Sequence, residues 1–110
     1  MESNYRTAQV FAWDTLAGLL RETDAGYVFS YTPEYLALPD ARSVSLTLPL
    51  REEPYISKTL FAFFDGLIPE GWLLDVVIHN WKIDRGDRFG LLLVACRDCI
   101  GAISVREVKE

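Results

Sequence analysis

The first third of the chain carries three short segments rich in β-forming residues, separated by connections of only a few residues. The segments are Gln9–Trp13, Leu16–Glu22 and Tyr27–Tyr31. Between them stand Asp14–Thr15 and Thr23–Gly26. Asp and Gly tolerate the backbone angles that a tight turn needs, so these connections predict turns. The pattern therefore predicts an antiparallel meander of three strands.

Three further local signals surround the meander. Gly18 is a candidate β-bulge within the second strand. Thr32–Leu36 has a capping residue followed by Pro33 at the first helical position, which predicts a single helical turn. Ser43–Leu50 alternates apolar with small polar residues, which predicts a strand or extended segment with one solvent face. Pro49 places that segment at a sheet edge or beyond the sheet.

The second half of the chain is patterned for helices. Ser57 is a candidate N-cap for a helix over Lys58–Asp65, and Gly66 would end it. A second helix is predicted over Pro69–Trp81, because proline suits the first helical position and Glu70 suits the positive end of the helix dipole.

The remaining segments complete the expected fold. Asp87 is expected to cap a third helix running from Arg88 to about Cys96, and Cys99–Val105 alternates as a final strand. We therefore predict one α+β domain over residues 1–110. Its small antiparallel sheet combines the N-terminal meander with the C-terminal strand, and about three helices pack on one side.

Charge and hydropathy exclude several classes of function. The 11 Lys and Arg against 16 Asp and Glu leave a formal net charge of −5, which is a poor match for phosphate backbones. The apolar run Leu91–Cys96 is far shorter than the ~20 residues that cross a bilayer. Met1–Arg6 lacks the features of a signal peptide. We expect a cytoplasmic protein that binds neither nucleic acid directly nor a membrane.

One predicted helix carries a tryptophan away from its own core face. Residues advance by about 100° along an α-helix, so most apolar residues of the Pro69–Trp81 helix gather in one stripe. Trp72 lies about 170° from the centre of that stripe, near Val76 and His79. Tryptophan is enriched at the centres of protein interfaces, because indole offers a large, rigid apolar surface.

The sequence leaves three interpretations of Trp72 open. An irregular first helical turn would swing the side chain inward. Another segment of the chain would cover it equally well. In the third interpretation, Trp72 is the central contact for a partner protein, together with Glu70, Gly71, Val76 and His79.

The sequence gives little support for a catalytic, metal-binding or nucleotide-binding site. Cys96 and Cys99 form a C-x-x-C pair that would suit a redox centre or half of a zinc site. Zinc needs four ligands, however, and His79 is the only histidine. The glycines form neither a G-x-G-x-x-G nor a Walker pattern. We therefore expect no enzyme activity, no cofactor and no metal site.

Four segments, in order along the chain, form a distinctive set. They are Tyr27–Leu36 (YVFSYTPEYL), Ala41–Leu50 (ARSVSLTLPL), Phe63–Gly71 (FFDGLIPEG) and Arg97–Ala102 (RDCIGA). This set resembles the N-terminal subdomain of HipA-type serine/threonine kinases. The chain departs from the family at Cys96, at Asp14–Thr15 and at Ser43, where the family usually has Gly, Asn-Gly and Pro. These departures touch turns and leave the core pattern intact.

The resemblance implies a partner and a role. HipA-type kinases continue for about 300 residues beyond this subdomain, whereas this chain ends at Glu110, so we expect it to lack the ATP site and the catalytic aspartate. It looks like the free-standing, HipS-like small proteins of tripartite toxin–antitoxin systems. In such systems the small protein looks like the antitoxin of a HipT-type kinase, and a HipB-like helix-turn-helix protein joins them in a ternary complex and binds DNA.

The implied function is therefore that of a kinase-binding antitoxin. The surface around Pro69–Trp72 is expected to meet the kinase N-lobe near its Gly-rich loop. One alternative is a non-inhibitory scaffold subunit that completes the kinase fold while a DNA-binding partner inhibits. Another alternative is a thiol redox module that uses Cys96 and Cys99.

Overall fold

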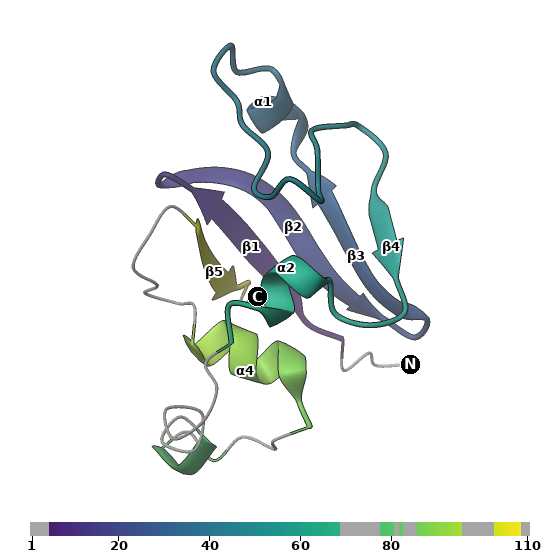
Figure 1. The fold of residues 1–110 in the computed structure, drawn as a ribbon, viewed down its shortest axis with the longest axis vertical. Coiled ribbons are helices and arrows are strands. Elements are labelled where there is room, and N and C mark those ends of the chain that lie inside the picture. Colours follow the sequence, from purple (N-terminus) through teal and green to yellow (C-terminus); the bar gives the residue numbers. More distant parts are fainter. Residues whose placement is uncertain (1–4, 69–77, 81, 83–85, 96–102, 109–110) are drawn as a thin grey trace.

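The computed structural model describes residues 5–68, 78–80, 82, 86–95 and 103–108. Within them, five strands form one antiparallel sheet in the order β4-β3-β2-β1-β5 (Figure 1). The strands are β1 (Thr7–Ala12), β2 (Thr15–Thr23), β3 (Gly26–Tyr31), β4 (Tyr55–Ser57) and β5 (Ile103–Glu107). The labelled helices are α1 (Pro33–Leu36), α2 (Ala62–Asp65) and α4 (Arg88–Ala95). The predicted α+β fold class is confirmed.

The predicted meander of β1, β2 and β3 is also confirmed. The β1–β2 register shifts after Val10, which pairs with Gly18, so that Phe11 pairs with Leu16. Ala17 is therefore the extra residue of a bulge, directly beside the glycine that the sequence marked. Bulges of this kind locally bend the strand that carries the extra residue and increase its twist.

Two caps form as their sequence signals predict. The Thr32 hydroxyl accepts a hydrogen bond from the Tyr35 amide at 3.1 Å, which begins α1 with Pro33 at its first turn. The Asp87 carboxylate accepts from the Gly90 amide at 3.1 Å, which caps α4. Because each cap lies within three residues of its donor, local sequence is enough to place it.

The prediction of a strand or extended segment over Ser43–Leu50 is wrong in its middle. Ser45 and Leu48 form an isolated bridge that closes a tight turn, so the chain folds back on itself there. The alternation does mark burial at Val44 and Leu48, which are both buried, whereas Leu50 at the end of the segment is exposed. Leu46 is instead 96% exposed at the tip of the turn.

The helix predicted over Lys58–Asp65 begins later than expected, at Ala62. Ser57 does not cap it, because Ser57 ends β4 and pairs with Tyr27 of β3. Gly66 follows the helix as predicted. The strand pairing therefore outcompetes the local capping signal.

Two further predictions fall largely outside the described residues. Most of the Pro69–Trp81 helix lies there, and residues 78–80 are helical. The sequence predicts the final strand over Cys99–Val105, and the structure has β5 over Ile103–Glu107. Residues 99–102 lie outside the described residues.

A single hydrophobic core fills the space between one face of the sheet and the helices. Figure 1 shows α2 in front of the sheet and α4 below it. Phe64 of α2 is completely buried, and its ring centroid lies 5.4 Å from that of Phe29 in β3. Phe89 of α4 is also completely buried and packs beside Tyr27. Every buried strand side chain points to this face, so the sheet has one core face and one opposite face.

A network of charges ties the start of the chain to α4. The Arg6 guanidinium donates to Glu22 at 2.8 and 3.0 Å and to Asp87 at 2.7 and 3.1 Å. It also lies 5.1 Å from the centroid of the Phe89 ring. The hydrogen bond from Arg6, with help from the Gly90 amide, lowers the pKa of Asp87. Arg6 thus holds β2 and the N-terminus of α4 together.

This network predicts a loss of stability in acid. The pKa of Asp87 is lower in the folded chain than the ~3.9 of an unfolded aspartate, so the carboxylate stabilises the fold above that pH. The stabilisation disappears as pH falls through the folded pKa. In thermal melts from pH 7 to pH 2.5, the melting temperature of wild type should exceed that of Asp87→Asn at neutral pH. The difference between the two melting temperatures should shrink as the pH falls. A difference in melting temperature as large at pH 2.5 as at pH 7 would contradict this origin.

Candidate protein-interaction surface

Of the five residues predicted for the contact surface, one lies among the described residues. Trp72, Glu70, Gly71 and Val76 lie outside the described residues. His79 is described, and it is exposed within the helical residues 78–80. Its neighbour Ile78 is partly buried and packs against the core. The placement of His79 on the outer side therefore agrees with the helical wheel at this one position.

The Leu46 turn, residues 45–48, presents the most exposed large apolar side chain of the described chain. The Ser45 hydroxyl accepts from the Thr47 amide at 3.2 Å, and the Leu48 amide donates to the Ser45 carbonyl at 3.0 Å. These bonds close the turn beneath Leu46. A leucine held out by an ordered turn loses little further entropy on binding, which suits it to be a contact residue.

Three tyrosine hydroxyls fix the chain on both sides of the Leu46 turn. Tyr35 donates to the Arg42 carbonyl at 2.7 Å, and Tyr55 donates to the Pro49 carbonyl at 2.6 Å. Tyr31 donates to the Leu48 carbonyl and accepts from the Val44 amide at 3.0 Å. Burial raises the pKa of Tyr31 to about 12, so its hydroxyl stays protonated at neutral pH. The turn is therefore a rigid projection and not a loose loop.

The Tyr31 hydroxyl gives a direct test of this anchoring. Tyr31→Phe leaves the Val44 amide and the Leu48 carbonyl without their buried partner, and each unsatisfied group costs about 1–3 kcal/mol. We expect an unfolding free energy lower by about 2 kcal/mol in urea melts. Amide exchange at residues 44–48 should also accelerate. A variant as stable and as protected as wild type would show that Tyr31 does not hold the turn.

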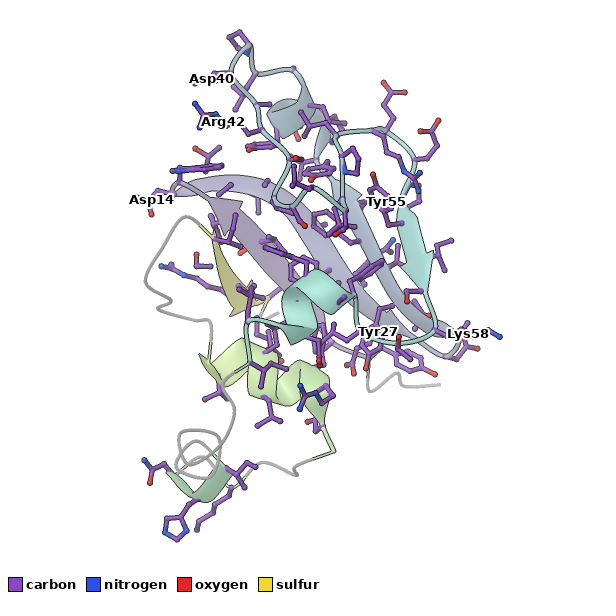
Figure 2. The ribbon with its side chains drawn as sticks, viewed as in Figure 1. Asp14, Tyr27, Asp40, Arg42, Tyr55 and Lys58 are labelled. Atoms are coloured by element: carbon purple, nitrogen blue, oxygen red, sulfur yellow. The ribbon has the colours of Figure 1, made fainter. Side chains whose placement is uncertain are left out.

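A second feature, the tip groove, lies where the β1–β2 turn meets the chain after α1. Its volume is about 290 Å³, and Trp13, Tyr35, Leu38, Asp40 and Arg42 contribute to its lining. Figure 2 shows Asp14, Asp40 and Arg42 gathered at this end of the sheet. This volume is at the lower end of the about 300–1,000 Å³ typical of ligand pockets, and it is large enough to accept one side chain of a partner protein.

Trp13 holds an unusual backbone conformation at the tip groove. The turn consists of Trp13 and Asp14, with φ of 50° and 67°, and not of Asp14–Thr15 as predicted. Positive φ at both positions is the requirement of a type I′ turn, which Asn-Gly meets at least cost. A tryptophan there is strained and also 53% exposed. Strain and apolar exposure at one residue favour a contact role over a structural one.

Arg42 lies over the ring of the exposed indole. Its guanidinium carbon lies 5.6 Å from the centroid of the Trp13 ring, in a cation–π arrangement. The tip groove therefore combines an aromatic surface with a cationic group and the Asp40 carboxylate. Such a surface can bind a mixed polar and apolar side chain.

The described residues were compared with the requirements of a metal site and of a membrane span. They contain no group of three His, Cys, Asp or Glu side chains that would hold a metal ion. In the same part of the chain, no helix has the length and hydropathy to span a membrane. The surface presents an exposed leucine on an ordered turn and an exposed tryptophan, and tryptophan is enriched at the centres of protein interfaces.

Comparison with known proteins gives the family. Residues 8–106 match the family described as the HipA N-terminal domain. The chain belongs to this family. A solved structure of the N-terminal domain of HipA toxin superposes with a TM-score of 0.74 at 33% identity, covering 100% of this chain and 99% of that one. An uncharacterized protein of Haemophilus influenzae is 37% identical over 110 residues, the full length of both chains.

Membership of the HipA N-terminal domain family confirms the resemblance expected from the four sequence segments. Sequence reasoning missed Leu46 and Trp13 as exposed residues, because it assigned each to a strand. Two signals were present for them: Ser45 and Thr47 flank Leu46 with turn-forming hydroxyls, and Asp14 follows Trp13 at a hairpin tip. Both signals compete with β-propensity, and neither decides the matter alone.

Proposed function

We propose that this chain is a HipS-like antitoxin, which binds a HipA-like serine/threonine toxin kinase of the HipT type and inhibits it by protein–protein contact. One observation carries the proposal. The Haemophilus influenzae relative is matched over its entire length, so in that protein the HipA N-terminal domain stands by itself. A domain that elsewhere belongs to a toxin is well suited to recognise the rest of that toxin when the two are separate chains.

The contact surface proposed for inhibition is the segment around Trp72. Glu70, Gly71, Val76 and His79 complete it, and we place its target at the kinase N-lobe, near the Gly-rich loop. A tryptophan that fills a pocket there would hold the kinase in an inactive arrangement. The Leu46 turn and the tip groove supply further exposed apolar contacts to the same partner. The chain would act by occupancy and needs no cofactor.

A HipB-like helix-turn-helix protein is the proposed third member of the complex. This chain carries a net charge of −5, so the basic surface that binds DNA would come from that partner. We expect no DNA binding by this chain alone at physiological salt.

The proposal is tested by growth and by enzyme activity. Cells that express a HipT-type kinase from the same genome should stop growing, and co-expression of this chain alone should restore growth. The purified chain should also lower phosphorylation by the purified kinase in proportion to the complex formed. Copurification without rescue would overturn the inhibitor role and leave a scaffold subunit. Failure to bind the kinase at all would overturn both roles.

A further inference from the structure

The sheet has a second face that its core does not use. Side chains alternate between the two faces along a strand. Because the buried residues of β1 and β3 point to the core face, Phe11 and Val28 lie on the opposite face. Leu16 and Leu19 of β2 and Ile56 of β4 share this side by register. None of these five belongs to the apolar residues that pack against the core. We call this side the open face.

The apolar residues of the open face form a continuous diagonal stripe. Ile56 pairs directly with Val28. Val28 pairs with Arg21, which places Leu19 at the diagonal position on β2. Leu19 pairs in turn with Gln9, which places Phe11 at the next diagonal. Diagonal neighbours on one face lie about 7–8 Å apart, within reach of large side chains.

The stripe crosses four of the five strands of the sheet and ends where two of its residues face each other across β1 and β2. Phe11 pairs with Leu16, so the stripe runs from β4 through β3 and β2 to β1. Its exposure rises toward β4, where Ile56 is 74% exposed. In a sheet covered on one side only, the other side is normally polar. Five apolar residues in one line are therefore unexpected on a face that contributes nothing to the core.

The charges on the open face are basic, although the whole chain is acidic. Arg21 and Arg106 point to this side, and both are exposed. The Arg106 guanidinium carbon lies 5.5 Å from the centroid of the Phe11 ring. Within the described residues, no carboxylate lies in ion-pair range of either arginine. The stripe is thus flanked by two cations that lack an acidic partner in this part of the chain.

From this arrangement we propose that the open face binds an amphipathic helix of the kinase partner, with an apolar stripe against the diagonal and acidic residues beside Arg21 and Arg106. The proposal rests on the proposed kinase partner and adds a second docking surface, separate from the Trp72 segment. Four strands about 4.8 Å apart span roughly 14 Å, which two to three helical turns would cover. The helix would form a third layer on the sheet.

A second copy of this chain fits the open face less well. Two copies packed face to face would bring four arginines, Arg21 and Arg106 of each copy, into one interface whose described residues supply neither arginine with an acidic partner, and like charges at an interface are unfavourable. Acidic flanking residues on a partner helix would instead pair with both arginines. The charge pattern therefore favours a different chain with acidic residues.

The test measures the affinity of the purified kinase for the full-length chain and four variants. Ile56→Asp and Arg21→Glu alter the open face, and each should weaken binding at least about tenfold. Leu50→Asp and Lys58→Glu make the same chemical changes at exposed positions outside the stripe, and each should stay within about twofold. Equal melting temperatures would show that every variant is folded.

The outcomes separate this inference from the proposed function. Wild-type binding that Ile56→Asp and Arg21→Glu leave unchanged would overturn the open-face site alone. Wild type that fails to bind the kinase would overturn both proposals. If the two variants instead change only the self-association of this chain, measured by light scattering, the open face is an interface between copies and the proposal is wrong.

Hydrogen exchange on the complex would test whether the kinase segment bound to the open face is a helix. We expect protection of β2 and β3 amides, together with one helical kinase segment that carries acidic residues on both sides of an apolar stripe. Protection of a kinase loop or strand at this face would overturn the helix.

Discussion

Phe64→Ala is expected to destabilise this domain strongly, as a truncation of one of its three completely buried phenylalanines in the described core. The Phe64 side chain is completely buried, and it is the one buried residue of α2. Its ring lies 5.4 Å from Phe29, 5.1 Å from Phe63 and 6.2 Å from Phe61, measured between centroids. Truncation removes the contacts that hold α2 on the sheet and leaves a cavity behind.

The expected loss of unfolding free energy follows from the general effect of truncating buried side chains. Replacing a buried phenylalanine with alanine costs about 3–5 kcal/mol, out of a total stability of about 5–15 kcal/mol for a domain. We expect the melting temperature to fall by about 12 °C or more. Phe63→Ala is the matched control, because Phe63 is partly exposed on the same helix and should cost much less. A fall below about 4 °C for Phe64→Ala would mean that α2 contributes little to the fold.

The parts of the fold that sequence predicts well are those fixed by near neighbours. The meander depends on β-rich segments joined by short turns, and each turn lies within a few residues of the strands it joins. The caps by Thr32 and Asp87 depend on a side chain and an amide three residues apart. These signals need no knowledge of the rest of the chain.

Sequence prediction failed where distant residues decide the local structure. The chain at Val44–Leu48 turns because the hydroxyl of Tyr31, from another strand, binds both ends of it. Ser57 joins β4 because Tyr27 offers a strand to pair with. Arg6 reaches Asp87 across 81 positions of sequence, so no local window contains that interaction. Tertiary contacts overrode local preference at Val44–Leu48 and at Ser57, and the Arg6–Asp87 contact adds to a cap that local sequence already predicts.

The candidate surface follows the same rule. Alternation in β1 and β3 predicts that one face of each strand is buried, but only the pairing register shows that Phe11, Leu19 and Val28 align in one stripe. The exposure of Trp13 depends on a one-residue shift of the turn. Periodicity assigns residues to faces, whereas the assembled sheet decides which residues become neighbours.

Trp72→Ala is expected to abolish most of the kinase affinity while leaving this domain folded. A tryptophan at the centre of a contact typically contributes at least about 2 kcal/mol, so affinity should fall about 30-fold. Growth rescue should be lost at the same expression level. Titration calorimetry with the purified kinase gives the affinity, and a thermal melt gives the stability of the variant.

The decisive comparison pairs this variant with Trp81→Ala. The helical wheel places Trp81 on the core stripe and Trp72 opposite it, so the two truncations should separate: Trp81→Ala should lower the melting temperature, and Trp72→Ala should lower affinity. A melting temperature that falls equally in both would mean that Trp72 is covered within the domain. Trp13→Ala removes a tryptophan of the same size from the tip groove. If that variant loses affinity and Trp72→Ala does not, the inhibitory contact belongs to the tip groove, and the helix only supports the fold.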